Sequence, residues 1–212
     1  MAKKYQKYRI VALTGILGVL FYVLHVFLGQ AAYPGYRAAS QAVSELSAIG
    51  APSRMVALLF FSLYSLCMIV FALGLWMLFR DRISGTFSIG CLLLLGTYVV
   101  SWIGCLFFPP AQSLATGFWK NVAHLILNGG VMLFSVAALL FIGLGVWKRY
   151  RWLSLFSFFA IFMVITGMVL SGLVGQMYVG AAQRISAFAL VLYDLLLAVW
   201  MMRYRPRTLN WY

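Results

Sequence analysis

Six long apolar runs constrain what this chain can fold into. Each run is long enough to cross the ~30 Å hydrocarbon core of a bilayer, which needs about 20 helical residues. Backbone polar groups in lipid must bond within their own segment, so each run is expected to be an α-helix, and the alternating pattern of a membrane barrel is absent. The segments cover approximately residues 9–29, 55–79, 86–108, 121–147, 153–175 and 185–203. The sequence therefore predicts an all-α, polytopic membrane protein with one transmembrane domain over residues 1–212.

The composition excludes the main soluble classes. The chain is 65% hydrophobic and 9% charged, whereas a soluble domain is about half apolar and about a quarter charged. A water-soluble globule of this length could not bury so much apolar surface. This excludes a soluble enzyme, a disordered chain and a disulfide-rich secreted module. The three cysteines lie in apolar runs without a C-x-x-C spacing and are expected to be buried small hydrophobes.

The basic residues predict the orientation in the membrane. Twelve of the sixteen Lys and Arg residues flank one end of the segments: Lys3, Lys4, Lys7, Arg9, Arg80, Arg82, Lys148, Arg149, Arg151, Arg203, Arg205 and Arg207. The other end carries Arg37, Arg54, Lys120 and Arg184. Cytoplasmic loops carry the excess of positive charge, so we expect both termini in the cytoplasm of a multi-pass cell-membrane protein, the cytoplasmic membrane in a prokaryote. No basic face is long enough to follow phosphates, so nucleic acid is not an expected partner.

The longest connection, residues 30–54, separates the first two segments and would face outward in this orientation. It contains two of the five prolines, so part of it is expected to be irregular. Val43, Leu46 and Ile49 recur at helical spacing. We therefore expect a short interfacial helix within residues 40–49.

Ionisable groups within or beside the apolar runs are candidate functional groups, because charge in lipid is costly. They are His25, Glu45, His124, Arg184 and Asp194. His25 and His124 lie at similar depth near the outward ends of their segments. They could face one another, or they could be unrelated interfacial histidines.

Glu45 and Asp194 each allow two interpretations. Glu45 could fold back over the mouth of the bundle, or it could cap a helical turn that starts near Ser40 or Ser44. Asp194 lies in the middle of its segment, and Arg184 is about 15 Å away along the helix. Asp194 could make a structural hydrogen bond or act in acid–base chemistry, and its candidate partners are Tyr64, Tyr98, Ser101, Asn128 and a histidine.

A polar stripe predicts a pocket. Asn121, His124 and Asn128 share one helical face, which should point inward. Together with Gln112, Glu45 and His25 this stripe predicts an outward-opening polar pocket. The expected ligand-binding residues are His25, Tyr36, Ser44, Glu45, His124, Asn128 and Arg184.

The string YPGYRAASQAVSELSAIGAPSR, residues 33–54, is the most distinctive stretch. It resembles the bacterial and archaeal membrane family catalogued as domain-of-unknown-function family 998. The residues that carry the resemblance are Pro34, Tyr36, Val43, Ser44, Glu45, Leu46, Gly50, Ala51, Pro52, Phe108, Pro109, His124 and Arg184. The resemblance covers most of the chain and implies six helices, with no established activity.

The chain departs from the family pattern at two places. Pro110 and Ala111 stand where the family usually has Thr-Asp, and Gln183 stands where it often has Glu. Both departures remove acid from the outer side. They put in doubt any metal or acid–base role that would use those carboxylates.

Three functions remain open, besides a structural or assembly role. The first is binding of a lipid or small molecule in the polar pocket. The second is an intramembrane enzyme that acts on a lipid or isoprenoid, with His124, Asp194 and Glu45 as acid–base groups. The third is a b-type haem protein with His25 and His124 as axial ligands. A zinc site of His25, His124 and Glu45 lacks local spacing support. The cofactor and oligomeric state are left open, and membrane lipid is the expected partner.

Overall fold

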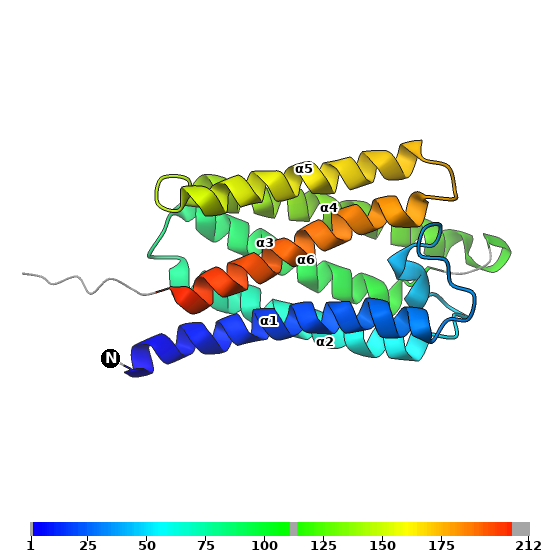
Figure 1. Cartoon of the computed structure of the whole chain (residues 1–212), viewed down its shortest axis with the longest axis horizontal. Helices are drawn as coiled ribbons and strands as arrows, with labels where there is room; N and C mark the ends of the chain where they lie inside the picture. Colours follow the sequence, from blue (N-terminus) through cyan, green and yellow to red (C-terminus); the bar gives the residue numbers. More distant parts are fainter. Residues whose placement is uncertain (1, 111–113, 205–212) are drawn as a thin grey trace, which may run out of the picture.

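The computed structural model describes residues 2–110 and 114–204, and the side chains of residues 5–110 and 118–204. This part of the chain is all-helical, and it contains six helices that are long and apolar enough to cross a membrane (Figure 1). They are α1 (Ala2–Ala31), α2 (Arg54–Phe79), α3 (Gly85–Phe107), α4 (Leu114–Val146), α5 (Arg151–Leu173) and α6 (Val179–Arg203). The predicted fold class is confirmed.

Three helices begin earlier than the apolar runs predict. α1 begins at Ala2, α4 at Leu114 and α6 at Val179. Hydropathy marks only the part of a helix that is compatible with lipid, whereas backbone hydrogen bonding continues into polar flanks. The other boundaries agree with the prediction within two residues.

The six helices form a closed ring. Each helix packs against the next one in the chain, and α6 packs against α1. The start of α1, the end of α6 and the α2–α3 and α4–α5 connections lie at one end of the bundle, which we call the terminal end (Figure 1). Residues 32–53 lie at the opposite end, which we call the loop end. Which end faces the cytoplasm stays a prediction.

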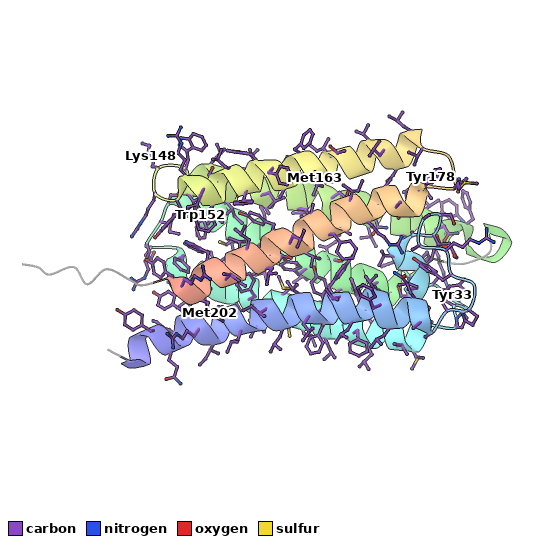
Figure 2. All side chains as sticks on the ribbon, viewed as in Figure 1. Tyr33, Lys148, Trp152, Met163, Tyr178 and Met202 are labelled. Carbon is purple, nitrogen blue, oxygen red and sulfur yellow. The ribbon has the colours of Figure 1, made fainter. Side chains whose placement is uncertain are left out.

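The terminal end is filled by aromatic side chains. The Phe79 ring lies 4.7 Å from that of Tyr204 and 5.0 Å from that of Trp200, measured between ring centroids. Tyr8 and Phe87 complete this cluster, and both are buried. Figure 2 draws the side chains on the ribbon, with Trp152 and Met202 labelled near the terminal end. The terminal end is therefore a packed core.

Glycines allow the closest approaches between helices. A Cβ at Gly145 of α4 would collide with the backbone of Phe87 in α3, and one at Gly167 of α5 would collide with Ser186 of α6. Small residues serve this purpose in membranes because lipid provides no hydrophobic drive for helix contact. By contrast, nothing lies within 4 Å of a Cβ placed at Gly172 or Gly175. These two glycines therefore face open space and make no close helix contact.

Residues 32–53 fold over the loop end. They contain a short 3-10 helix, η1 (Val43–Ser47), within the region where a helix was expected. Leu46 of η1 is fully buried, and the Ser53 hydroxyl donates a hydrogen bond to its backbone oxygen over 2.7 Å. Gly50 has a φ of 89° in the following turn, a backbone conformation that favours glycine. That η1 lies at a membrane interface stays a prediction.

Candidate functional site

A cavity of about 600 Å³ occupies the half of the bundle nearest the loop end. All six helices and η1 contribute to its lining. Along α6 the lining runs from Gln183 to Asp194, a distance of roughly 16 Å at the helical rise. The cavity thus extends from the loop end to the middle of the bundle.

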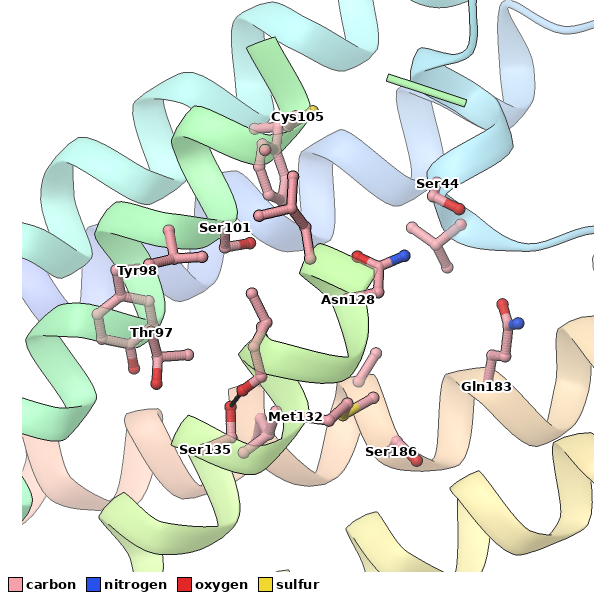
Figure 3. A pocket seen from close by; sticks show the side chains of 18 of the residues that line it. Ser44, Thr97, Tyr98, Ser101, Cys105, Asn128, Met132, Ser135, Gln183 and Ser186 are labelled. Atoms are coloured by element: carbon pink, nitrogen blue, oxygen red, sulfur yellow. Dashed lines mark hydrogen bonds between the residues drawn. The ribbon is translucent and has the colours of Figure 1, made fainter. Parts of the chain in front are cut away.

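Polar side chains lie at both ends of this length, and apolar side chains with some hydroxyls lie between them. Ser44, Asn128 and Gln183 surround the end near the loops, and Thr97 and Tyr98 lie at the inner end (Figure 3). Between these polar ends, the walls include Leu127, Val131, Met132, Leu190 and Val191. A molecule that fills the cavity would therefore meet polar groups at both ends and a largely apolar surface between them.

Lining residues of α4 and α5 are exposed at the surface of the bundle. These helices pack tightly toward the terminal end, where the Ser154 hydroxyl donates to the backbone oxygen of Gly143 over 2.6 Å. Toward the loop end they offer exposed lining residues: Leu125 of α4 is 72% exposed, and Met168 of α5 is 46% exposed. The cavity therefore reaches the outer surface of the bundle at these two helices.

Asp194 lies at the inner end of the cavity and is only 2% exposed. The Tyr98 hydroxyl donates a hydrogen bond of 2.5 Å to its Oδ1 atom. Its Oδ2 atom is buried and accepts no hydrogen bond from any described residue. Tyr98 was among the partners that the sequence suggested. The carboxyl group therefore retains one unused acceptor atom beside the cavity.

An aromatic row leads from Asp194 toward His25. The ring centroids are 6.1 Å apart for Tyr98 and Tyr64, 5.1 Å for Tyr64 and Tyr22, and 5.8 Å for Tyr22 and His25. His25 Nδ1 lies 2.9 Å from the backbone oxygen of Ala57. A carbonyl oxygen only accepts, so Nδ1 donates, and Nε2 of the neutral ring is left as an acceptor.

His124 joins α4 to the end of α3. Its Nδ1 atom donates to the backbone oxygen of Phe108 over 3.0 Å, and its Nε2 atom accepts from the Asn128 side-chain amide over 2.9 Å. Both ring nitrogens are thus used within the protein. Asn121, His124 and Asn128 all line the cavity, as their shared helical face predicts.

Arg184 holds residues 32–53 against α6. Its guanidinium donates to the backbone oxygens of Ala38 and Gln41 and to the Tyr36 hydroxyl, the last over 2.7 Å. Burial raises the pKa of Tyr36, although Arg184 acts in the opposite direction. The phenol therefore stays protonated near neutral pH and donates to the backbone oxygen of Ala42 over 2.8 Å. Neither Arg184 nor Tyr36 is among the residues that line the cavity.

Glu45 caps η1. Its Oε1 atom accepts from the backbone nitrogen of Ala42 over 2.8 Å, and its Oε2 atom accepts from the Gln41 side-chain amide over 3.2 Å. This geometry corresponds to the capping interpretation, although the turn begins at Ala42 and not at Ser40 or Ser44. Glu45 does not line the cavity, whereas the adjacent Ser44 does. Gln112, also expected at the pocket, lies outside the described residues.

The structure therefore brings five of the predicted site residues to one cavity: His25, Ser44, His124, Asn128 and Asp194. The sequence analysis missed several polar lining residues, including Tyr22, Thr97, Ser135 and Ser186. Serine and threonine hydroxyls in helices commonly bond their own backbone, as Thr97 does with Leu93 and Ser135 with Val131. Their sequence pattern therefore carried no signal. Tyr22 had one, because it lies three residues before His25.

A second hollow lies between α5 and α6, with a volume of about 700 Å³. Its lining is almost wholly apolar or aromatic, apart from Arg203 at the terminal end. The hydroxyl of Tyr193, which also lines it, pairs with that of Ser157 over 2.5 Å. This second hollow lacks converging polar groups with unused hydrogen bonds. The first cavity is therefore the better candidate site.

Comparison with known proteins identifies a family. The family model described as "Protein of unknown function (DUF998)" matches residues 16–200, which include most of α1, most of α6 and everything between them. Neither the curated proteins nor the solved structures provide a match. The matched region contains the whole cavity lining and the residues 33–54 that carried the resemblance. The chain is therefore a multi-pass membrane protein that belongs to this family of unknown function.

Proposed function

We propose that the protein binds an amphipathic, lipid-like molecule in the cavity at the loop end. The observation that carries this proposal is a cavity of about 600 Å³ that has polar ends and largely apolar walls, and that reaches the bundle surface at Leu125 of α4 and Met168 of α5. Ligand sites span roughly 300–1,000 Å³ and combine apolar walls with a few polar groups. The size and lining of the cavity thus suit a small amphipathic ligand.

The exposed lining residues of α4 and α5 favour access from the bilayer. Leu125 and Met168 border the cavity and are exposed where the helices would meet lipid. A molecule dissolved in the membrane reaches such residues without leaving the apolar phase. If the termini are cytoplasmic, as the distribution of basic residues favours, the ligand comes from the outer leaflet of the cell membrane.

Two alanines of α6 allow a matched test. Ala187 lines the cavity, and Ala189 lines the hollow between α5 and α6. Ala187→Phe should fill the cavity and remove a bound molecule, whereas Ala189→Phe should leave that molecule in place. Native mass spectrometry of both variants, purified in a mild detergent, compares the bound masses directly. Equal occupancy in the two variants would refute the proposal, and so would a wild-type protein that never carries or accepts a lipid-like mass.

The enzyme alternative has less support from the geometry. Of its three suggested acid–base groups, Glu45 caps η1 and His124 uses both ring nitrogens in hydrogen bonds. Only Asp194 keeps an unused atom at the cavity. A single carboxyl group without an adjacent base or nucleophile makes a better binding group than a catalytic pair.

The haem and zinc alternatives have less support still. A metal would need the Nε2 lone pair of His124, which accepts the amide hydrogen of Asn128. The part of the chain that the structure describes holds no group of three or more His, Cys, Asp or Glu side chains placed to bind a metal ion. The lipid-like ligand therefore remains the best-supported proposal.

A further inference from the structure

We infer that the inner end of the cavity recognises a positively charged ammonium group, so that the ligand is a lipophilic amine. This inference rests on the proposed binding function and specifies the chemistry of the ligand. It follows from the charges, the unused acceptor atoms and the aromatic rings that meet at Asp194.

The described residues that line the cavity include an acidic side chain but no lysine or arginine. Asp194 is the only acidic residue among them. An ionised carboxylate in apolar surroundings needs a partner of opposite charge. The cavity supplies none of its own, so a cationic ligand would complete this site.

Arg184 does not serve as that partner. It lies ten residues before Asp194 in the same helix, about 15 Å along the axis. Its guanidinium also donates hydrogen bonds to Ala38, Gln41 and Tyr36 at the loop end. Arg54, at the start of α2, donates to the backbone oxygen of Ser47 over 3.2 Å.

The inner end of the cavity holds an unused acceptor atom at Asp194, and His25 offers another at the far end of the aromatic row. Asp194 Oδ2 accepts no hydrogen bond from the residues that the structure describes, and His25 keeps Nε2 as an acceptor because Nδ1 donates to Ala57. An ammonium group carries only donors, whereas a carboxylate or phosphate carries acceptors. The unpaired oxygen of Asp194 therefore matches an amine and opposes an anionic head.

The aromatic rings beside Asp194 are the second feature that favours an ammonium group. Tyr22, Phe61, Tyr64 and Tyr98 all line the cavity, and successive ring centroids lie between 5.1 and 6.1 Å apart. The faces of such rings attract cations, more strongly when water is excluded. A lipophilic amine with one hydrocarbon chain would place its ammonium group beside Asp194 and these rings. Its hydrocarbon chain would lie along the apolar wall toward Leu125 and Met168.

Three single-chain probes with the same tail test the head-group preference. Dodecylamine is cationic at neutral pH, dodecanol is neutral and dodecanoate is anionic. Their binding is measured by native mass spectrometry on protein in nanodiscs of zwitterionic phosphatidylcholine, for the wild type, Asp194→Asn and Ala187→Phe. The Ala187→Phe variant reports binding outside the cavity, because its side chain should fill that space.

The wild type should bind dodecylamine most tightly and dodecanoate most weakly. Asp194→Asn should weaken dodecylamine binding by roughly tenfold or more, since a hydrogen bond to a charged group is lost, and should change dodecanol binding by less than about twofold. Ala187→Phe should abolish the binding of every probe. That pattern supports both the binding function and the choice of ligand.

The two proposals fail in different ways. If Ala187→Phe removes all binding but the wild type binds dodecanol or dodecanoate as tightly as dodecylamine, the cavity is a lipid site and the amine inference is wrong. If Ala187→Phe leaves the binding of every probe unchanged, the binding function itself is wrong. If Asp194→Asn does not fold, the order of the three probe affinities in the wild type still decides between the ligands. Asp194→Glu keeps the charge and must show the same order of affinities.

Discussion

Asp194 is an acidic side chain buried in a membrane helix, where burial of a polar group costs free energy. One hydrogen bond, from the Tyr98 hydroxyl, offsets part of that cost. Its other oxygen is buried without a partner among the described residues. An unsatisfied buried polar atom costs about 1–3 kcal/mol. At the residue scale, the structure therefore retains at Asp194 a group that disfavours stability, as expected where a side chain serves binding.

Tyr98→Phe tests how much that one hydrogen bond contributes. The substitution leaves both carboxyl oxygens of Asp194 buried without a partner, so we expect a loss of about 1–3 kcal/mol in the free energy of unfolding. Thermal unfolding in detergent measures the change. Tyr64→Phe is the matched control, because Tyr64 packs beside Tyr98 and donates nothing to Asp194. An equal loss in both variants would contradict this role for Tyr98.

At the scale of the elements, glycines decide where helices touch and where they separate. α4 shows both situations: Gly145 packs directly on the backbone of Phe87, whereas nothing lies within 4 Å of a Cβ placed at Gly129. The tight end of α4 closes the bundle at the terminal end. The loose end of the same helix borders the cavity.

Gly145→Ala and Gly129→Ala form a matched pair on one helix. Gly145→Ala should destabilise the protein by about 1–3 kcal/mol, because the added methyl group overlaps the α3 backbone. Gly129→Ala should change stability little, since it enters open space. Melting temperatures in one detergent compare the two variants. A smaller loss for Gly145→Ala than for Gly129→Ala would contradict the packing described for α4.

At the scale of the whole molecule, the ring of helices has a packed end and a hollow end. Aromatic side chains fill the terminal end, and the cavity occupies the half nearest residues 32–53. Those residues cover the hollow end and are held there by Arg184 and Tyr36. The residues that carry the family resemblance in this segment therefore build the cover of the cavity, and only Val43 and Ser44 among them also line it.

The orientation of the whole molecule is testable with introduced cysteines. In a variant whose native cysteines are replaced by alanine, Ser40→Cys marks the loop end and Asp81→Cys marks the terminal end. The excess of basic residues at the terminal end predicts that it faces the cytoplasm. A membrane-impermeant thiol reagent should label position 40 in intact cells, and position 81 only after permeabilisation. The opposite pattern would place the cavity at the cytoplasmic side.

Local pattern was sufficient for some features. Apolar run length determines which segments can span a bilayer, because backbone groups in lipid must bond within a helix. The shared face of Asn121, His124 and Asn128 follows from helical periodicity alone, and all three line the cavity. The family of the chain was also recognisable from residues 33–54 and a few later positions.

Tertiary structure decided which of the polar residues share a site. Glu45 and Arg184 carry the family resemblance together with Ser44 and His124, yet their side chains bond the backbone of residues 32–53 and do not line the cavity. Tyr98 meets Asp194 across 96 positions of sequence, a contact that no local spacing encodes. The physical reason is that helical periodicity fixes which residues share a face of one helix. Which faces meet, and where they leave a hollow, depends on contacts between helices that are distant in the sequence.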